Sequence, residues 1–157
     1  MEILIVYDSF FGNTEKIARS IASAYSGHSV RIIKAGQDGP AHTGCPDILI
    51  AGSPTRAFKP VRSVTECIKK IPAGTIEGIQ TAAFDTRIPY DRIKPKILGK
   101  IMSLLGYAAG PLGKMLVKKG GIEASGPEGF IVMDSEGPLR DGEEERARQW
   151  ALSIISK

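Results

Sequence analysis

The first twenty residues constrain the fold of this chain more than any other segment. Residues 2–7 form a short apolar run, Glu-Ile-Leu-Ile-Val-Tyr, whose β-branched content is typical of a buried parallel strand. From Lys16 onward, apolar residues recur at three- and four-residue spacing, which predicts a helix over residues 13–25. A strand, a tight loop and a helix in this order leave unpaired backbone N–H groups and the positive end of a helix dipole at the loop. Such a loop is suited to bind a phosphate.

The loop over residues 8–14 reads Asp-Ser-Phe-Phe-Gly-Asn-Thr. Its composition indicates which class of phosphate ligand it could bind. It carries neither the Walker A pattern nor the G-x-G-x-x-G pattern of dinucleotide-binding loops. Its donors are hydroxyls and backbone amides, and no basic residue precedes Lys16. Hydrogen bonds alone would therefore hold the phosphate, which suits a terminal monoester. The alternative is an ordinary strand-to-helix turn with Ser9 or Thr14 as the N-cap.

Strands and helices alternate along the rest of the chain. Further strands are predicted over residues 29–34, 46–52, 81–85 and 129–133. Helices are predicted over residues 61–71, 107–119 and from 141 to the C-terminal region, with a short extra helix over 97–105. This alternation is typical of a parallel α/β sheet with helices on both faces. We expect residues 1–157 to form a single domain, because no linker or repeat divides them.

Composition excludes several classes of function. The net charge is +4, but the basic residues are dispersed without interleaved aromatic residues, so we expect no nucleic-acid partner. No apolar run is long enough to cross a membrane, and residue 2 is a glutamate where a signal peptide would be basic, so we expect a cytoplasmic protein with no membrane partner. Cys45 and Cys67 form no metal-binding pattern, and His28 and His42 are isolated, so no metal site is expected.

The loop after the first strand resembles the FMN phosphate loop of flavodoxins, whose pattern is Ser/Thr-x-Thr-Gly-x-Thr. Ser9, Gly12 and Thr14 match that pattern, while Phe11 stands where a hydroxyl residue is usual. The resemblance runs nearly end to end. It implies a flavodoxin-like, doubly wound, five-stranded parallel sheet of order 2-1-3-4-5 in a three-layer α/β/α arrangement. It also implies FMN as the cofactor, bound beyond the carboxyl ends of the strands.

In that topology the loops after the first, third and fourth strands meet at one site. The resemblance therefore implies cofactor contacts from three groups of residues: Ser9, Phe10, Phe11, Gly12, Asn13 and Thr14; Ser53, Pro54, Thr55, Arg56, Ala57 and Phe58; and Asp85, Thr86, Arg87 and Tyr90.

The aromatic and basic residues of these loops have predicted roles. Phe58 and Tyr90 occupy positions where flavodoxins place residues that sandwich the isoalloxazine ring. Tyr90 could equally anchor its loop, and Phe10 with Phe11 could instead form the apolar wall. Two guanidinium groups, at positions 56 and 87, would stabilise the anionic reduced flavin.

These features predict a flavodoxin-like carrier that moves electrons between redox partner proteins, as a monomer or weak homodimer. No set of catalytic residues is apparent in the sequence. One alternative is an FMN-dependent NAD(P)H:quinone-type reductase, with residues 86–106 as a lid or substrate wall. The other is an interaction module that has the flavodoxin fold without the flavin, which Phe11 and the basic charge both favour.

Overall fold

Six parallel strands form one sheet at the centre of the computed structural model, which describes residues 1–36, 44–92, 95, 97 and 106–155. The strands are β1 (Glu2–Tyr7), β2 (Ser29–Lys34), β3 (Ile48–Pro54), β4 (Gln80–Arg87), β5 (Ile122–Glu123) and β6 (Glu128–Ile131). Their order is β2-β1-β3-β4, and β4 pairs in turn with both β5 and β6. Ile122 lies opposite Gln80 at the start of β4, and Glu128 lies opposite Phe84 farther along. The fifth place in the sheet is therefore shared by two short strands.

The predicted order 2-1-3-4-5 is confirmed, with one strand more than expected. β6 overlaps the strand predicted over residues 129–133, whereas the two-residue strand β5 was not predicted. β3 and β4 each run two residues farther at the carboxyl end than predicted. As a result, Ser53, Pro54, Thr86 and Arg87 belong to strand ends and are held by the sheet, where the sequence suggested loops.

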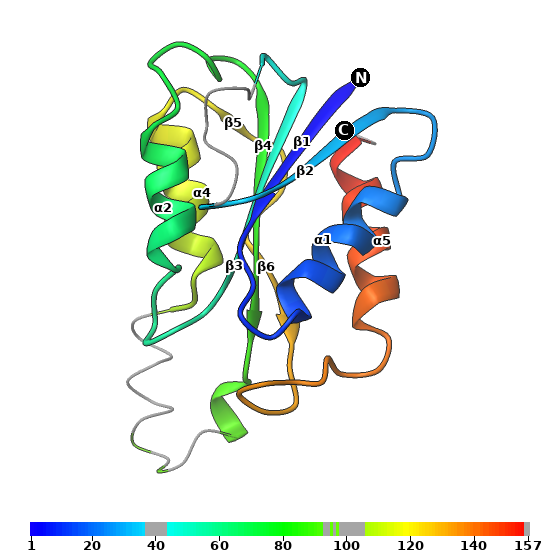
Figure 1. Cartoon of the computed structure of the whole chain (residues 1–157), viewed down its shortest axis with the longest axis vertical. Coiled ribbons are helices and arrows are strands. Elements are labelled where there is room, and N and C mark those ends of the chain that lie inside the picture. Colours follow the sequence, from blue (N-terminus) through cyan, green and yellow to red (C-terminus); the bar gives the residue numbers. More distant parts are fainter. Residues whose placement is uncertain (37–43, 93–94, 96, 98–105, 156–157) are drawn as a thin grey trace.

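Helices cover both faces of the sheet, which confirms the three-layer arrangement. α1 (Asn13–Ser23) and α5 (Glu143–Ile155) lie side by side on one face, and α2 (Arg62–Lys69) and α4 (Ala109–Lys118) lie on the other (Figure 1). A 3-10 turn, η2 (Tyr90–Arg92), follows β4. Pro111 falls in the first turn of α4, where its missing N–H group breaks no helical hydrogen bond. The helix predicted over residues 97–105 lies, apart from Ile97, outside the described residues.

The apolar run of β1 is explained by burial on both faces. Side chains alternate across a strand, so Ile3 and Ile5 pack against α1 and α5 while Leu4 and Val6 pack against α2 and α4. The larger residues of the helices complete the two cores, among them Ile17, Ile21, Trp150 and Ile154 on one face and Val64, Ile68, Leu112 and Leu116 on the other. None of the helices in the described part of the chain has the length and apolar character to span a membrane.

Gly52 is required where β3 passes the ring of Phe84. The two residues are paired across β3 and β4, and a Cβ atom at position 52 would overlap the Phe84 ring. That ring is fully buried and lies edge-on to Phe130 and Trp150, with centroid distances of 6.0 and 6.2 Å, so it has no free space to enter.

We expect Gly52→Ala to lower the free energy of unfolding by about 1–3 kcal/mol, because overpacking a filled core forces strained side chains. Urea denaturation followed by circular dichroism measures this change. Gly126→Ala is the control, since a Cβ atom there meets nothing within 4 Å. Equal stability of the two variants would show that the core around Phe84 is loosely packed.

Candidate functional site

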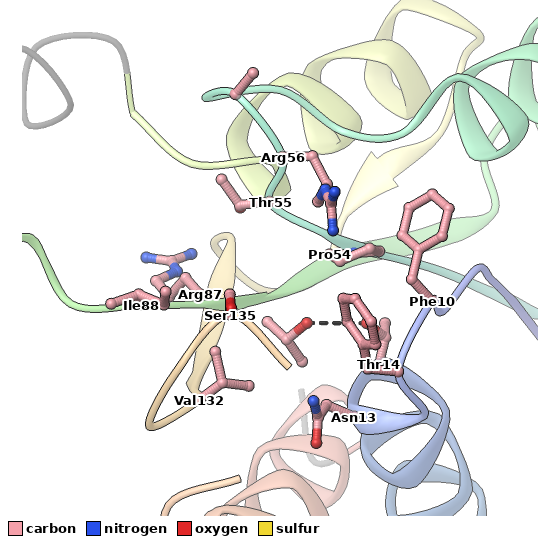
Figure 2. Close-up of a pocket in the computed structure, with 13 residues that line it drawn as sticks. Phe10, Asn13, Thr14, Pro54, Thr55, Arg56, Arg87, Ile88, Val132 and Ser135 are labelled. Carbon is pink, nitrogen blue, oxygen red and sulfur yellow. Dashed lines mark hydrogen bonds between the residues drawn. The ribbon is translucent and has the colours of Figure 1, made fainter. Parts of the chain in front are cut away.

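A cavity of about 230 Å³ lies at the carboxyl ends of the central strands. Its walls come from four segments: the loop after β1, the loop after β3, the end of β4 and the segment after β6 (Figure 2). The lining residues are Phe10, Phe11, Asn13, Thr14, Pro54, Thr55, Arg56, Ala57, Thr86, Arg87, Ile88, Val132 and Ser135. Thus most of the predicted cofactor contacts come together around one cavity.

The loop after β1 enters α1 through Gly12, which adopts a left-handed conformation with φ of 83°. A glycine suits this position because other residues rarely adopt it. No side chain caps the helix, so neither Ser9 nor Thr14 acts as an N-cap here. The N–H groups of the first helical turn are thereby left without a side-chain partner at the cavity, and such groups bind anions.

Two polar side chains of α1 connect the loop to its neighbours. The Oγ1 atoms of Thr14 and Thr86 are 2.9 Å apart and share a hydrogen bond (dashed in Figure 2). Asn13 Nδ2 donates to the carbonyl oxygen of Glu136 at 2.9 Å. The helix start is thus connected by hydrogen bonds to β4 and to the segment after β6, two other walls of the cavity.

Ser9 is the polar residue of this loop that the protein leaves unsatisfied. Its side chain is 7% exposed, and its Oγ atom is the one buried side-chain nitrogen or oxygen of the described residues without a hydrogen-bond partner. A buried hydroxyl without a partner costs about 1–3 kcal/mol. An unsatisfied buried group of this kind calls for an explanation, and a ligand that supplies the missing bond is one.

The loop after β3 is a tight hairpin that aims Arg56 at the cavity. Arg56 and Lys59 exchange two backbone hydrogen bonds of 3.0 Å, and the intervening Ala57 and Phe58 have φ of 45° and 68°. Two positive φ angles are typical of a type I′ turn and are strained for residues other than glycine. The Arg56 guanidinium lies 5.1 Å from the ring centroid of Phe10 and 5.9 Å from that of Phe11. The positive charge of Arg56 therefore lies between the loop after β1 and the loop after β3.

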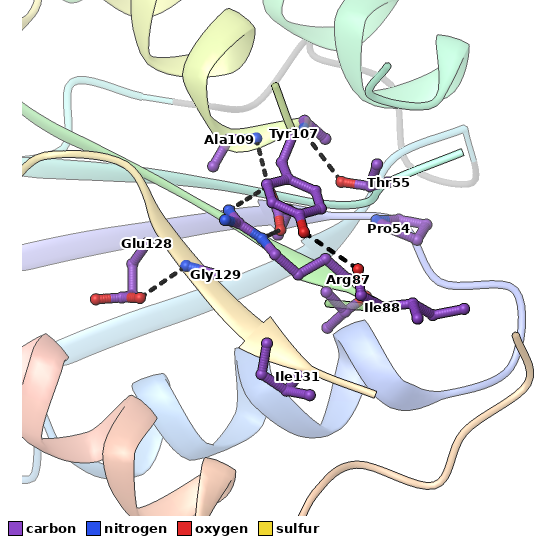
Figure 3. Close-up of polar contacts among 12 residues, drawn as sticks. Pro54, Thr55, Arg87, Ile88, Tyr107, Ala109, Glu128, Gly129 and Ile131 are labelled. Carbon is purple, nitrogen blue, oxygen red and sulfur yellow. Dashed lines mark hydrogen bonds and ion pairs between the residues drawn. The ribbon is translucent and has the colours of Figure 1, made fainter. Parts of the chain in front are cut away.

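A buried ion pair organises the end of β4 (Figure 3). Asp85 is fully buried, and Arg87 donates to it from Nε at 2.5 Å and from Nη2 at 2.8 Å. The backbone N–H of Ala109 also donates to Asp85, at 2.7 Å. Burial raises the pKa of Asp85, and the bonds from Arg87 and Ala109 act in the opposite direction. Asp85 therefore ties the start of α4 to the sheet and orients Arg87.

Arg87 is held on its other side by an aromatic stack. Its guanidinium carbon lies 3.8 Å from the ring centroid of Tyr107, and Tyr107 stacks on Tyr90 with centroids 4.2 Å apart. Gly129 of β6 makes room for the guanidinium, because a Cβ atom there would overlap it. Tyr90 thus packs on another tyrosine of the protein, and no sequence pattern predicted Tyr107 as its partner.

Six of the predicted contacts do not line the cavity. They are Ser9, Gly12, Ser53, Phe58, Asp85 and Tyr90. Ser53 Oγ accepts from the N–H of Val61 at 3.0 Å and donates to the carbonyl of Pro54 at 2.8 Å, which closes the hairpin loop. Three lining residues were not predicted: Ile88, Val132 and Ser135. Ligands of such sheets lie beyond the carboxyl ends of the strands. Including the segment at the carboxyl end of the last strand would therefore have found Val132 and Ser135.

Glu143 fixes the segment that carries Val132 and Ser135. Its side chain is 2% exposed and accepts hydrogen bonds from the backbone N–H of Ile131 at 3.0 Å and from both Arg140 and Arg146. Burial by itself raises the pKa of Glu143, but the bonds from Arg146, Ile131 and Arg140 outweigh it, so the pKa lies below its ordinary value. The ionised carboxylate is therefore favoured in the folded state.

We expect Glu143→Gln to lower the free energy of unfolding at pH 7 by about 1–3 kcal/mol, because charged hydrogen bonds are lost. A lowered pKa in the folded state stabilises the protein above the ordinary glutamate pKa, and the stabilisation is lost as the pH falls through the lowered value. The difference between wild type and variant should thus shrink on acidification below that ordinary pKa, as urea titrations at several pH values would show. The exposed Glu136→Gln is the control, and a difference independent of pH would contradict this role.

The charge of the cavity lining favours an anion. Arg56 and Arg87 line it, none of its described lining residues is an aspartate or glutamate, and the threonine and serine hydroxyls add donors. Among the described residues, no group of three or more histidine, cysteine, aspartate or glutamate side chains could hold a metal ion. The site is therefore suited to a ligand that carries negative charge.

No protein-family model matches the sequence, and a search of curated proteins finds no match either. Solved structures do match in fold. An archaeal flavodoxin is similar with a TM-score of 0.76 and 16% identity, over 99% of this chain and 97% of that one. Oxidised flavodoxin 2 from Bacillus cereus has a TM-score of 0.75 and 17% identity, over 99% of both chains. The rubredoxin oxygen:oxidoreductase of Desulfovibrio gigas has a TM-score of 0.75 and 19% identity, over 99% of this chain and 35% of that one. The chain therefore has a flavodoxin-like fold.

Proposed function

We propose that the cavity binds FMN noncovalently and that the protein carries electrons between redox partner proteins. The observation that carries this proposal is the uncapped start of α1, where Asn13 and Thr14 line the cavity. The loop that leads into it holds the buried Ser9 hydroxyl, which has no partner and does not itself line the cavity. Both features suit a phosphate monoester, which accepts several hydrogen bonds at once. The flavodoxin-like fold supports it, because ligands of this fold lie beyond the carboxyl ends of the strands, where the cavity is found.

The residues present fit the parts of FMN. Ser9, Thr14 and the backbone N–H groups at the start of α1 would hold the phosphate. Thr86 brings a second hydroxyl to Thr14, which offsets the hydroxyl missing at Phe11. Phe10 and Phe11 supply apolar surface at the cavity. At about 230 Å³ the cavity is smaller than pockets that enclose a whole ligand, which favours a ligand left partly exposed.

The protein supplies electrostatic control. When bound, FMN accepts and releases electrons through its isoalloxazine ring. Arg56 and Arg87 bring positive charge to the cavity and would favour the reduced, anionic form of a bound ring. Arg87 is held by Asp85 and Tyr107, so its charge is fixed in place, whereas Arg56 is exposed and rests on two rings.

The direct test is a titration of the purified protein with FMN, followed by flavin fluorescence and visible absorption. We expect one FMN to bind per chain with a dissociation constant of about 1 μM or below, equivalent to about 8 kcal/mol. Riboflavin, which lacks the phosphate, should bind more weakly. A protein that leaves FMN fluorescence unchanged would overturn the proposal and favour an interaction module without flavin.

A second measurement distinguishes an electron carrier from the alternative, an FMN-dependent reductase. The exposure of Phe10 and Phe11 leaves the mouth of the cavity accessible, which a hydride donor would need. NADH and NADPH oxidation by the FMN-loaded protein, with and without a quinone, distinguishes the two functions. We expect turnover no faster than that of free FMN.

A further inference from the structure

The mouth of the cavity exposes aromatic surface. Phe10 is 59% exposed and Phe11 is 48% exposed, although large apolar side chains are normally buried. They are adjacent in the loop after β1, and Figure 2 shows Phe10 beside Arg56 at the edge of the cavity. Aromatic and arginine side chains are the residues that most often dominate the binding energy of protein interfaces. The mouth therefore has the composition of the centre of a contact surface.

Four exposed cations follow the carboxyl ends of β3 and β4, and we call them the basic rim. They are Arg56, Lys59, Arg62 and Arg92. None of them forms an ion pair with another described residue, and the Arg56 guanidinium contacts the Phe10 and Phe11 rings. An exposed cation without an ion pair keeps its charge available to a partner protein.

Exposed carboxylates come from a different segment. Between β6 and α5 they are Asp134, Glu136 and Asp141. Asp8, at the start of the first loop, is half-buried and accepts hydrogen bonds from the backbone N–H of Ser9 at 2.7 Å and from the Ser63 hydroxyl. The basic rim thus sets the sign of the potential on the side of the loop after β3.

We propose that the basic rim and the exposed phenylalanines form a docking surface for an acidic redox protein. The inference rests on the proposed function, since a partner that exchanges electrons with a cofactor in the cavity must approach the cavity mouth. Opposite charges on the two surfaces speed encounter and orient the partner. The apolar rings then supply surface that is buried on contact.

The probe is a pair of redox proteins of opposite net charge: native horse-heart cytochrome c, which is basic, and its succinylated form, in which lysine ammonium groups are converted to carboxylate-bearing amides and which is acidic. We expect the succinylated form to bind at about 20 mM salt and to weaken as salt screens the charges. The native form should bind at least about tenfold more weakly, because the rim repels it. Binding is measured by biolayer interferometry with the full chain immobilised through a terminal tag.

Two double variants with the same change in net charge locate the surface. Lys59→Gln with Arg62→Gln removes two rim charges that do not line the cavity. Lys70→Gln with Lys118→Gln removes two exposed charges at the C-terminal ends of α2 and α4, on the side of the sheet where the strands begin. We expect the rim variant to lose about tenfold in affinity for the succinylated form and the control to lose less than about twofold, because screening limits the effect of distant charges. Equal losses would overturn the proposal.

A second readout separates the docking surface from the cofactor. Binding of both cytochromes is measured with and without added FMN. Failure of FMN to bind, with the charge preference intact, would remove the proposed function and leave the surface standing. FMN binding with no preference between the two cytochromes would remove the surface alone. The FMN-loaded protein is reduced with one equivalent of dithionite, so that no reductant remains, and each fully reduced flavin would then supply two electrons, one to each of two ferric haems. The succinylated form should be reduced faster, and the rim variant should lose that advantage.

Discussion

Replacing Ser9 and Thr14 together by alanine should weaken FMN binding by about 100-fold or more. A hydrogen bond to a charged group contributes about 1.5–3 kcal/mol, and each 1.4 kcal/mol corresponds to a tenfold change in affinity. The Ser9 hydroxyl has no partner in the protein, so a phosphate would be its first. The Thr14 hydroxyl shares a bond with Thr86 and can donate outward while accepting from it.

The measurement is the ratio of FMN affinity to riboflavin affinity, because only FMN carries the phosphate. In the wild type FMN should bind far more tightly, and in the double variant the two should approach each other. Ser23→Ala is a matched control that removes a helical hydroxyl bonded to the Ser20 carbonyl. A double variant that keeps the full preference for FMN would show that the backbone of the loop alone holds the phosphate.

Ser9→Ala alone should have opposite effects on binding and on stability. Removing a buried hydroxyl that lacks a partner relieves a cost of about 1–3 kcal/mol, so the variant without FMN should unfold at higher urea concentration. The same change should weaken FMN binding. This opposition would mark Ser9 as a residue retained for its ligand.

Asp85→Ala should cause the largest loss of stability, about 3–5 kcal/mol, because it leaves Arg87 without its partner. Asp85 is fully buried and joins Arg87 to the first backbone N–H of α4. Its removal therefore loosens the end of β4 and the start of α4 together. Urea denaturation followed by tryptophan fluorescence measures the loss, since Trp150 is buried in the core.

A second variant tests the mechanism of that loss. Arg87→Met in the Asp85→Ala background should restore part of the stability, because no unpaired guanidinium then remains. The control is Glu66→Ala, which breaks the exposed ion pair with Lys69 and should leave stability unchanged within error. A double variant no more stable than Asp85→Ala would show that the bond to Ala109 carries the effect.

The sequence predicted the start of the chain well because two independent patterns coincide there. The apolar run of β1 and the helical periodicity of α1 leave one short loop between them, and Gly12 lies at the point where the backbone needs positive φ. β5 escaped prediction because it has two residues, both exposed, and so carries neither alternation nor an apolar run.

The roles of individual site residues were less predictable, since they depend on contacts between distant segments. From the sequence, Tyr90 could pack on the protein or on a ligand. The residue on which it stacks, Tyr107, is 17 positions farther along the chain. The use of Asp85 to anchor α4 depends on where the helix begins, which Gly110, Pro111 and Gly113 obscured. Local patterns do not record such long-range pairings.

The division of the last place in the sheet between β5 and β6 also affects how the chain behaves in concentrated solution. An uninterrupted strand at a sheet edge offers a row of free N–H and C=O groups on which another chain can form a further strand, and this is a common first step of aggregation. Here the edge consists of a two-residue strand and a four-residue strand, separated by residues 124–127. Neither strand is long enough to template an added strand, so the interruption protects this edge, and the six-residue strand β2 at the other edge is where an added strand could pair.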